Sequence, residues 1–97
     1  MEHQVRIVKI SPGKMDDFVA AWTANVGRLR RRHGFTLEGT WIIEDTNEFV
    51  WVLGYDGDGT FAEAEKRYFE SAERIDVGDV PPEFVIEARA HMARKVV

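Results

Sequence analysis

The segment EFVWVLGY, residues 48–55, places the strongest constraint on how this chain can fold. Its valine and aromatic residues are typical of a β-strand, and apolar side chains run without a break from Phe49 to Leu53. Successive side chains of a strand point to opposite faces of the sheet, so this strand needs a cover on both faces. The rest of the chain must supply one cover, and any second cover must come from elsewhere.

Three further segments are predicted to be strands. Residues 35–44 precede the central stretch and are joined to it by the turn-forming triplet DTN, which favours a hairpin. Residues 3–10 alternate and carry β-branched side chains, and the last strand is expected within VIEARAHMARKVV, residues 85–97. The sheet is therefore predicted to have four strands.

Two helices are predicted between these strands. The first, over residues 12–32, has Ser11 as the expected N-cap, Pro12 at the first helical position and an apolar residue at every third or fourth position. The second covers residues 60–73, and a polar stretch at 74–83 follows it.

The second helix begins with a capping box formed by Thr60 and Glu63. The element order is thus β-α-β-β-α-β, which predicts an α+β, ferredoxin-like fold with an antiparallel sheet and both helices on one face. Residues 1–97 are expected to form this single domain.

The amino-acid composition excludes several classes of binding partner and chemistry. The chain has a net charge of −4, which argues against binding to nucleic acid, and it has no cysteine, which excludes disulfides, thiolate metal sites and a cysteine nucleophile. Neither a signal peptide nor a membrane-spanning segment is predicted, so we expect a cytoplasmic protein without a membrane partner. The arginine-rich run RLRRRHG, residues 28–34, is expected to be solvated at the end of the first helix, where cations complement the dipole, although an anion-binding patch is the alternative.

The sheet face away from the helices is predicted to bind a second copy of the chain. Either Phe49, Trp51 and Leu53 or Val50 and Val52 must point to that face, and the sequence does not decide which set does. An exposed apolar surface of this kind marks an association site, and two sheets packed about a twofold axis would cover it.

Three stretches of the sequence resemble NIPSNAP-type members of the dimeric α/β-barrel superfamily, which also contains antibiotic-biosynthesis monooxygenases. They are QVRIVKISPGKMDDFVAAW (4–22), RRHGFTLEGTWI (31–42) and NEFVWVLGYDG (47–57). The resemblance implies a homodimer whose sheets form a barrel, with a small pocket between sheet and helices in each subunit. It implies no single reaction, because members of one fold carry unrelated activities.

Aromatic residues are the candidate ligand-binding groups. Large aromatic side chains with a polar tip suit a cavity for a planar or aromatic molecule, and the odd positions of the strands are expected to share the apolar face. The alternative is a well-filled core. The predicted ligand-binding residues are Trp22, Trp41, Trp51, Tyr68 and Met92.

Two residues are candidates for catalysis. Barrel monooxygenases that work without a cofactor use an asparagine and a tryptophan at a spacing similar to that of Asn47 and Trp51, so the resemblance implies a role for Asn47, although a turn position also explains it. Histidine is the side chain whose ordinary pKa lies nearest neutrality, so His91 would serve as a general base in a desolvated pocket.

Alternating charged residues on the last strand are predicted to lie at the dimer interface. Pairs such as Arg6 with Glu87 or Glu38 with Arg89 would fix the register between the two copies. The predicted interface set is Arg6, Glu38, Val50, Val52, Glu87 and Arg89.

Two classes of function remain open at this point. The first is a homodimer that binds or transforms a hydrophobic, aromatic small molecule without metal or flavin, as a monooxygenase, cyclase or isomerase would. The second is a structural or regulatory homodimer with a filled aromatic core. No cofactor is expected: DGDGT (56–60) fails the calcium-loop pattern, and residues 60–73 lack the histidine with which related barrel enzymes ligate haem. The sequence does not decide whether the chain is an enzyme.

Overall fold

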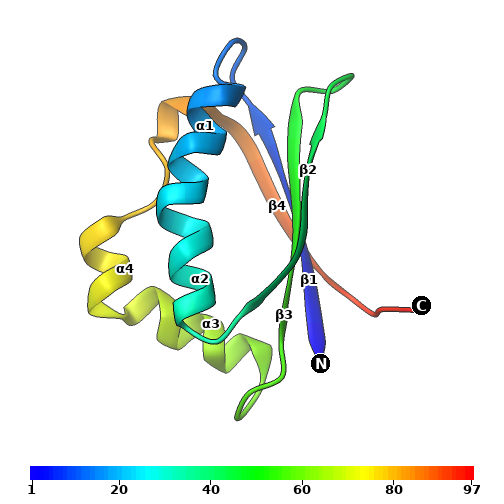
Figure 1. Cartoon of the computed structure of the whole chain (residues 1–97), viewed down its shortest axis with the longest axis vertical. Coiled ribbons are helices and arrows are strands. Elements are labelled where there is room, and N and C mark those ends of the chain that lie inside the picture. The colour runs from blue at the N-terminus through cyan, green and yellow to red at the C-terminus, as the bar shows by residue number, and fades with distance from the viewer.

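The computed structural model describes residues 1–97 and confirms the predicted α+β, ferredoxin-like architecture (Figure 1). Four antiparallel strands form one sheet in the order β2-β3-β1-β4, and the helices all lie on one face of it. None of the helices is long and apolar enough to span a membrane. The strands are β1 (Glu2–Ile10), β2 (Thr36–Ile43), β3 (Glu48–Tyr55) and β4 (Val85–Ala93).

The first helix begins later than predicted. The backbone N–H of Lys14 donates to the carbonyl oxygen of Ser11 at 3.1 Å, which closes a turn with Pro12 and Gly13 in its centre. Gly13 has a φ of 76°, the conformation that a type II turn requires after proline. Ser11 is therefore a turn residue and does not cap the helix. The helix then runs without interruption through α1 (Met15–Ala21), the π-helical segment η1 (Trp22–Gly27) and α2 (Arg28–Arg32).

The second helix begins as predicted. The hydroxyl of Thr60 accepts from the backbone N–H of Glu63 at 3.2 Å, and the carboxylate of Glu63 accepts from the N–H of Thr60 at 2.9 Å, so both halves of the capping box are present. This helix ends at Glu70, earlier than predicted, because Ser71 is extended. Ser71 then caps a further short helix, which continues into the stretch predicted to be only polar, by accepting from the N–H of Arg74 at 3.2 Å. These elements are α3 (Phe61–Glu70), α4 (Ala72–Val77) and the 3₁₀ turn η2 (Pro82–Phe84).

The central strand β3 places its larger side chains under the helices. Phe49, Trp51 and Leu53 are each at most 3 % exposed, whereas Val50 and Val52 point to the other face and are half-buried. The partners across the neighbouring strand follow the same division: Val8 lies opposite Phe49 and Ile7 opposite Val50. This decides the strand face that the sequence left open.

Strand β2 changes its face partway along. Leu37 lies opposite Leu53, but after an irregularity in the ladder Gly39 lies opposite Val52. The extra residue of a β-bulge shifts all later side chains to the other face. The odd positions of β2 therefore do not share one face, and the prediction that they do was wrong.

Candidate ligand-binding cavity

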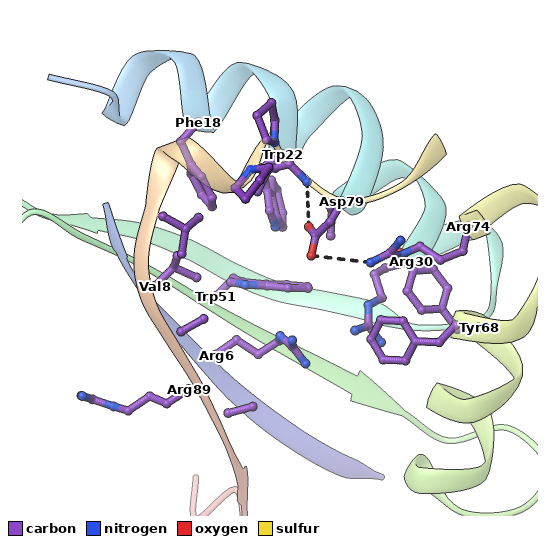
Figure 2. A pocket seen from close by; sticks show the side chains of 18 residues that line it. Arg6, Val8, Phe18, Trp22, Arg30, Trp51, Tyr68, Arg74, Asp79 and Arg89 are labelled. Atoms are coloured by element: carbon purple, nitrogen blue, oxygen red, sulfur yellow. Dashed lines mark hydrogen bonds and ion pairs between the residues drawn. The ribbon is translucent and has the colours of Figure 1, made fainter. Parts of the chain in front are cut away.

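A cavity of about 730 Å³ lies between the first helix, the sheet and the segment that leads from α4 to β4. Helix residues Phe18 and Trp22 form one wall, Trp51 lies on the sheet side, and Tyr68 from α3 closes one end (Figure 2). Ala88 and Ala90 of β4 also line it. Their small side chains leave space where larger residues would fill the gap between sheet and helices.

The wall of the cavity is built from interlocking aromatic rings. Trp22 packs edge-on against Trp51, with ring centres 5.1 Å apart and an interplanar angle of 74°. Phe49 contacts both Trp22 and Phe18 at the same centre-to-centre distance, 5.1 Å. Tilted and edge-to-face pairs of this kind are the favoured geometry for aromatic side chains, so the wall holds its shape without a ligand.

Two arginines from different elements meet at one carboxylate beside this wall. Arg6 of β1 and Arg30 of α2 both donate to Oε1 of Glu65 on α3, at 3.1 and 3.0 Å. The guanidinium carbons of the two arginines lie 5.4 and 5.7 Å from the ring centre of Trp51. The aromatic wall and the cationic end of the cavity are therefore contiguous.

Arg30 is almost fully buried, with 1 % of its surface exposed. Its guanidinium carbon lies 4.2 Å from the ring centre of Tyr68 and 4.9 Å from that of Phe35. Its Nε and Nη1 atoms are buried without a hydrogen-bond partner. Burial lowers the pKa of Arg30, and the neighbouring charge of Arg6 lowers it further. The aromatic faces and Glu65 thus compensate only part of the cost of desolvating this cation.

Two neutral donors on the same cavity also lack partners. The indole Nε1 of Trp22 and the hydroxyl of Tyr68 are buried and make no hydrogen bond. Burial raises the pKa of Tyr68 above its ordinary value, so the hydroxyl stays protonated at neutral pH. Buried polar atoms without partners are uncommon in native proteins. Both residues line the cavity, so the cavity wall contains polar atoms that the chain itself leaves without a partner.

The structure brings together three of the five predicted ligand-binding residues and leaves two outside. Trp22, Trp51 and Tyr68 line the cavity. Trp41 lies opposite Val50 on the far face of the sheet and is 54 % exposed, so its assignment to this pocket was wrong because of the bulge in β2. Met92 lies beyond the cavity, where its sulfur accepts from the side-chain amide of Gln4 at 3.8 Å and the residue is 54 % exposed.

Neither candidate catalytic residue lies in the cavity. His91 is opposite Val5, on the face of the sheet away from the helices. Asn47 occupies the β2–β3 turn with a φ of 54°, and its side-chain amide donates to the carbonyl oxygen of Ile10 at 2.9 Å. Asn47 thus holds the turn against the end of β1.

The predicted interface residues divide between the two faces. Arg6 faces the helices and lines the cavity, so its predicted pairing with Glu87 across the dimer was wrong: in β1, the even-numbered residues point to the helix side. Glu87 and Arg89 lie opposite Lys9 and Ile7 on the other face. Figure 2 shows the Arg89 side chain extending away from the cavity, although the residue borders its rim. The face away from the helices also carries Glu38, Val50 and Val52.

Arg30 is a cavity residue that was not predicted, because its neighbours in the arginine-rich run favoured a solvated surface. One signal was present: Phe18, Trp22, Val26 and Arg30 are spaced four residues apart and share one face of the helix. The prediction of a solvated run holds for the exposed Arg28, Arg31 and Arg32 but was wrong for Arg30. No comparable signal pointed to Arg74, which lines the cavity and lies 3.5 Å from the carboxylate of Asp79 (Figure 2).

No protein-family model matches this sequence, and no curated protein matches it either. The chain contains no group of three or more histidine, aspartate or glutamate side chains that could hold a metal ion.

Solved structures show where the fold recurs. An uncharacterised NIPSNAP domain protein from Burkholderia xenovorans superposes with a TM-score of 0.81 at 16 % identity, over 99 % of this chain and 95 % of that one. A NIPSNAP family protein of unknown function from Agrobacterium tumefaciens gives a TM-score of 0.81 at 15 % identity, over 96 % and 86 % of the two chains. An antibiotic biosynthesis monooxygenase gives 0.73 at 10 % identity over the whole of both chains. The chain therefore has the fold of NIPSNAP proteins and antibiotic biosynthesis monooxygenases, as its sequence motifs predicted.

Proposed function

We propose that this chain is a homodimeric protein of NIPSNAP type that binds a hydrophobic, aromatic small molecule in the cavity between its helices and its sheet. The observation that carries the proposal is the 730 Å³ cavity walled by Trp22 and Trp51. Ligand pockets are typically a few hundred to about 1,000 Å³ in volume and are lined mainly by apolar and aromatic side chains. The cavity meets both conditions.

The alternative of a filled aromatic core accounts for the burial of Trp22 and Trp51, which are 7 % and 3 % exposed, but not for the space beside them. A structural dimer without a ligand would pack Trp22 and Trp51 against their neighbours and leave room for a few waters at most. Here Ala88 and Ala90 of β4 line the same open space as these rings.

Binding is better supported than catalysis. A monooxygenase, cyclase or isomerase acting without metal or flavin needs a general base within reach of its substrate. No histidine lines the cavity, and its one lining carboxylate, Asp79, already accepts from the N–H of Val80 at 2.8 Å and lies 3.5 Å from Arg74. His91 and Asn47 lie outside it.

The face of the sheet away from the helices supports the homodimer. It is apolar over β1, β3 and the β2 edge and charged elsewhere: Lys9, Glu48 and Glu87 lie along one end, and Arg89 and His91 lie along the β4 edge. Trp41 and Ile43 are 54 % and 40 % exposed in the single chain. A second copy related by a twofold axis would cover these side chains. The apolar residues of this face are Val5, Ile7, Val50 and Val52 on the central strands, and Trp41 and Ile43 on the edge strand β2.

A thermal-shift screen with quinols and flavonoid-like phenols tests the binding function. The matched variants are Ala88→Phe, which places a large side chain in the cavity, and Ala62→Phe, which adds the same group to the exposed surface of α3. We expect at least one phenol to raise the melting temperature of the wild type and of Ala62→Phe but not of Ala88→Phe. Stabilisation of Ala88→Phe equal to that of the wild type, or no stabilising compound in the panel, would contradict the proposal.

A further inference from the structure

The charges around the cavity do not balance. Its charged lining residues are Arg6, Arg30, Arg74, Arg89 and Asp79. Arg74 is paired with Asp79, and Arg89 extends away from the space (Figure 2). Arg6 and Arg30 remain, and they share one carboxylate, that of Glu65. Two guanidinium groups and one carboxylate leave an excess of one positive charge beside the Trp51 ring.

The atoms without partners have one chemical character in common. A guanidinium and an indole N–H donate hydrogen bonds and cannot accept them, and a protonated phenol donates as well. The unpaired buried atoms of the site are Nε and Nη1 of Arg30, Nε1 of Trp22 and the hydroxyl of Tyr68. The site thus has donors without partners in the chain and an excess of positive charge, and an acceptor that carries negative charge complements both.

We infer that the cavity selects an aromatic monoanion, with its ring against Trp22 and Trp51 and its carboxylate at the end formed by Arg6 and Arg30. This inference rests on the proposed binding function and specifies the class of ligand. A carboxylate offers acceptors only, in the planar form that a guanidinium binds best. Arg6 has 26 % of its side chain exposed and is accessible, while the more buried Arg30 adds charge in a poorly solvated setting.

The test compares two probes of nearly the same shape, 2-naphthoate and 2-naphthamide, by calorimetric titration at pH 7. A charge-assisted hydrogen bond to a partly buried cation discriminates by about tenfold or more. We therefore expect naphthoate to bind at least about tenfold more tightly than naphthamide. The preference should fall to about threefold or less in Arg6→Met and remain unchanged in Arg31→Met, which removes the same charge from an exposed position next to Arg30.

Glu65→Gln is expected to change the preference for naphthoate in the opposite direction from Arg6→Met. Removing the shared carboxylate leaves both guanidinium groups free for the ligand, so the preference for naphthoate should rise several-fold. A residue that merely shapes the cavity would instead weaken both probes alike when replaced. Because Glu65→Gln is expected to be less stable, its folding is checked by circular dichroism and the titration is run below its melting temperature.

The outcomes separate the two proposals. Equal binding of the two probes, tighter binding of naphthamide, or a preference unchanged in Arg6→Met would overturn the selection for an anion while leaving the aromatic cavity intact as a binding site. Weaker binding of naphthoate to Glu65→Gln would also overturn it. If neither probe binds and no phenol raises the melting temperature, the proposed binding function fails as well.

Discussion

Replacing Glu65 is expected to destabilise the protein more than replacing Arg30, although Arg30 is the more buried of the two. The side chains of Arg30 and Glu65 are 2 % and 20 % exposed. Glu65→Gln leaves a buried guanidinium without its counter-charge, whereas Arg30→Met removes that guanidinium and leaves Glu65 paired with Arg6 at 3.1 Å. The two substitutions therefore have different costs.

The expected changes in the free energy of unfolding follow from how deeply Arg30 and Glu65 are buried. Removing one partner of a fully buried ion pair costs about 3–5 kcal/mol, and because Glu65 is partly exposed we expect about 2–4 kcal/mol for Glu65→Gln. Replacing a buried ionic group by an apolar side chain of similar length is often close to neutral, so Arg30→Met should change the free energy of unfolding by about 1 kcal/mol or less. Methionine also retains contact with the rings of Phe35 and Tyr68, which now surround the guanidinium.

Urea denaturation at pH 7 followed by tryptophan fluorescence measures both variants and the double variant. In the double variant the unpaired cation is absent, so it should be more stable than Glu65→Gln alone, with a coupling energy of about 1–3 kcal/mol. The reasoning is refuted if Arg30→Met loses more stability than Glu65→Gln, or if the two effects simply add.

Three further predictions concern other parts of the molecule. Light scattering during size exclusion should give a mass of about twice the 11.1 kDa monomer mass. Val50→Lys on the open sheet face should lower the measured mass to that of one chain, whereas Lys66→Glu on the exposed surface of α3 should not. A monomeric wild type at micromolar concentration contradicts the dimer. Gly27→Ala would bring a Cβ to 2.9 Å from the indole of Trp22. This overlap should outweigh a helix-propensity gain of about 1 kcal/mol, so the variant should have a lower melting temperature and weaker ligand binding. The exposed Thr23→Ala should change neither. Hydrogen bonds from Thr60 lower the pKa of Glu63, so the stability contributed by this carboxylate is present above the ordinary glutamate pKa and is lost as the pH falls through its lowered value. Glu63→Gln should therefore flatten the acid limb of the stability curve, and Thr60→Ala should cost about 1 kcal/mol at pH 7; an unchanged acid limb in Glu63→Gln would count against the capping box.

The predicted elements that proved correct depend on local chemistry. The capping box at Thr60 is a matter of four consecutive residues, and the apolar stripe that includes Phe18 and Trp22 is fixed by the helical repeat. The need for a cover on both faces of β3 likewise follows from its unbroken apolar run. These features, together with the order of elements, were enough to predict the fold.

The composition of the site was decided by tertiary structure. A single irregularity between Leu37 and Gly39 removes Trp41 from the cavity, and the pairing of β1 with β3 turns Arg6 toward the helices. Neither the position of Trp41 nor that of Arg6 can be predicted from the alternating pattern within one strand. The sheet face to which a side chain points depends on the register of its strand with the neighbouring strand.

The four-stranded sheet with helices on one face follows from the sequence alone, since each element is specified by residues close together along the chain. The meeting of Arg6, Arg30 and Glu65 beside Trp51, by contrast, depends on the packing of the whole chain. The three charged residues come from β1, α2 and α3, and the contact between Arg30 and Glu65 spans 35 positions. Such a contact is set by how the helices pack on the sheet, which no local pattern in the sequence encodes.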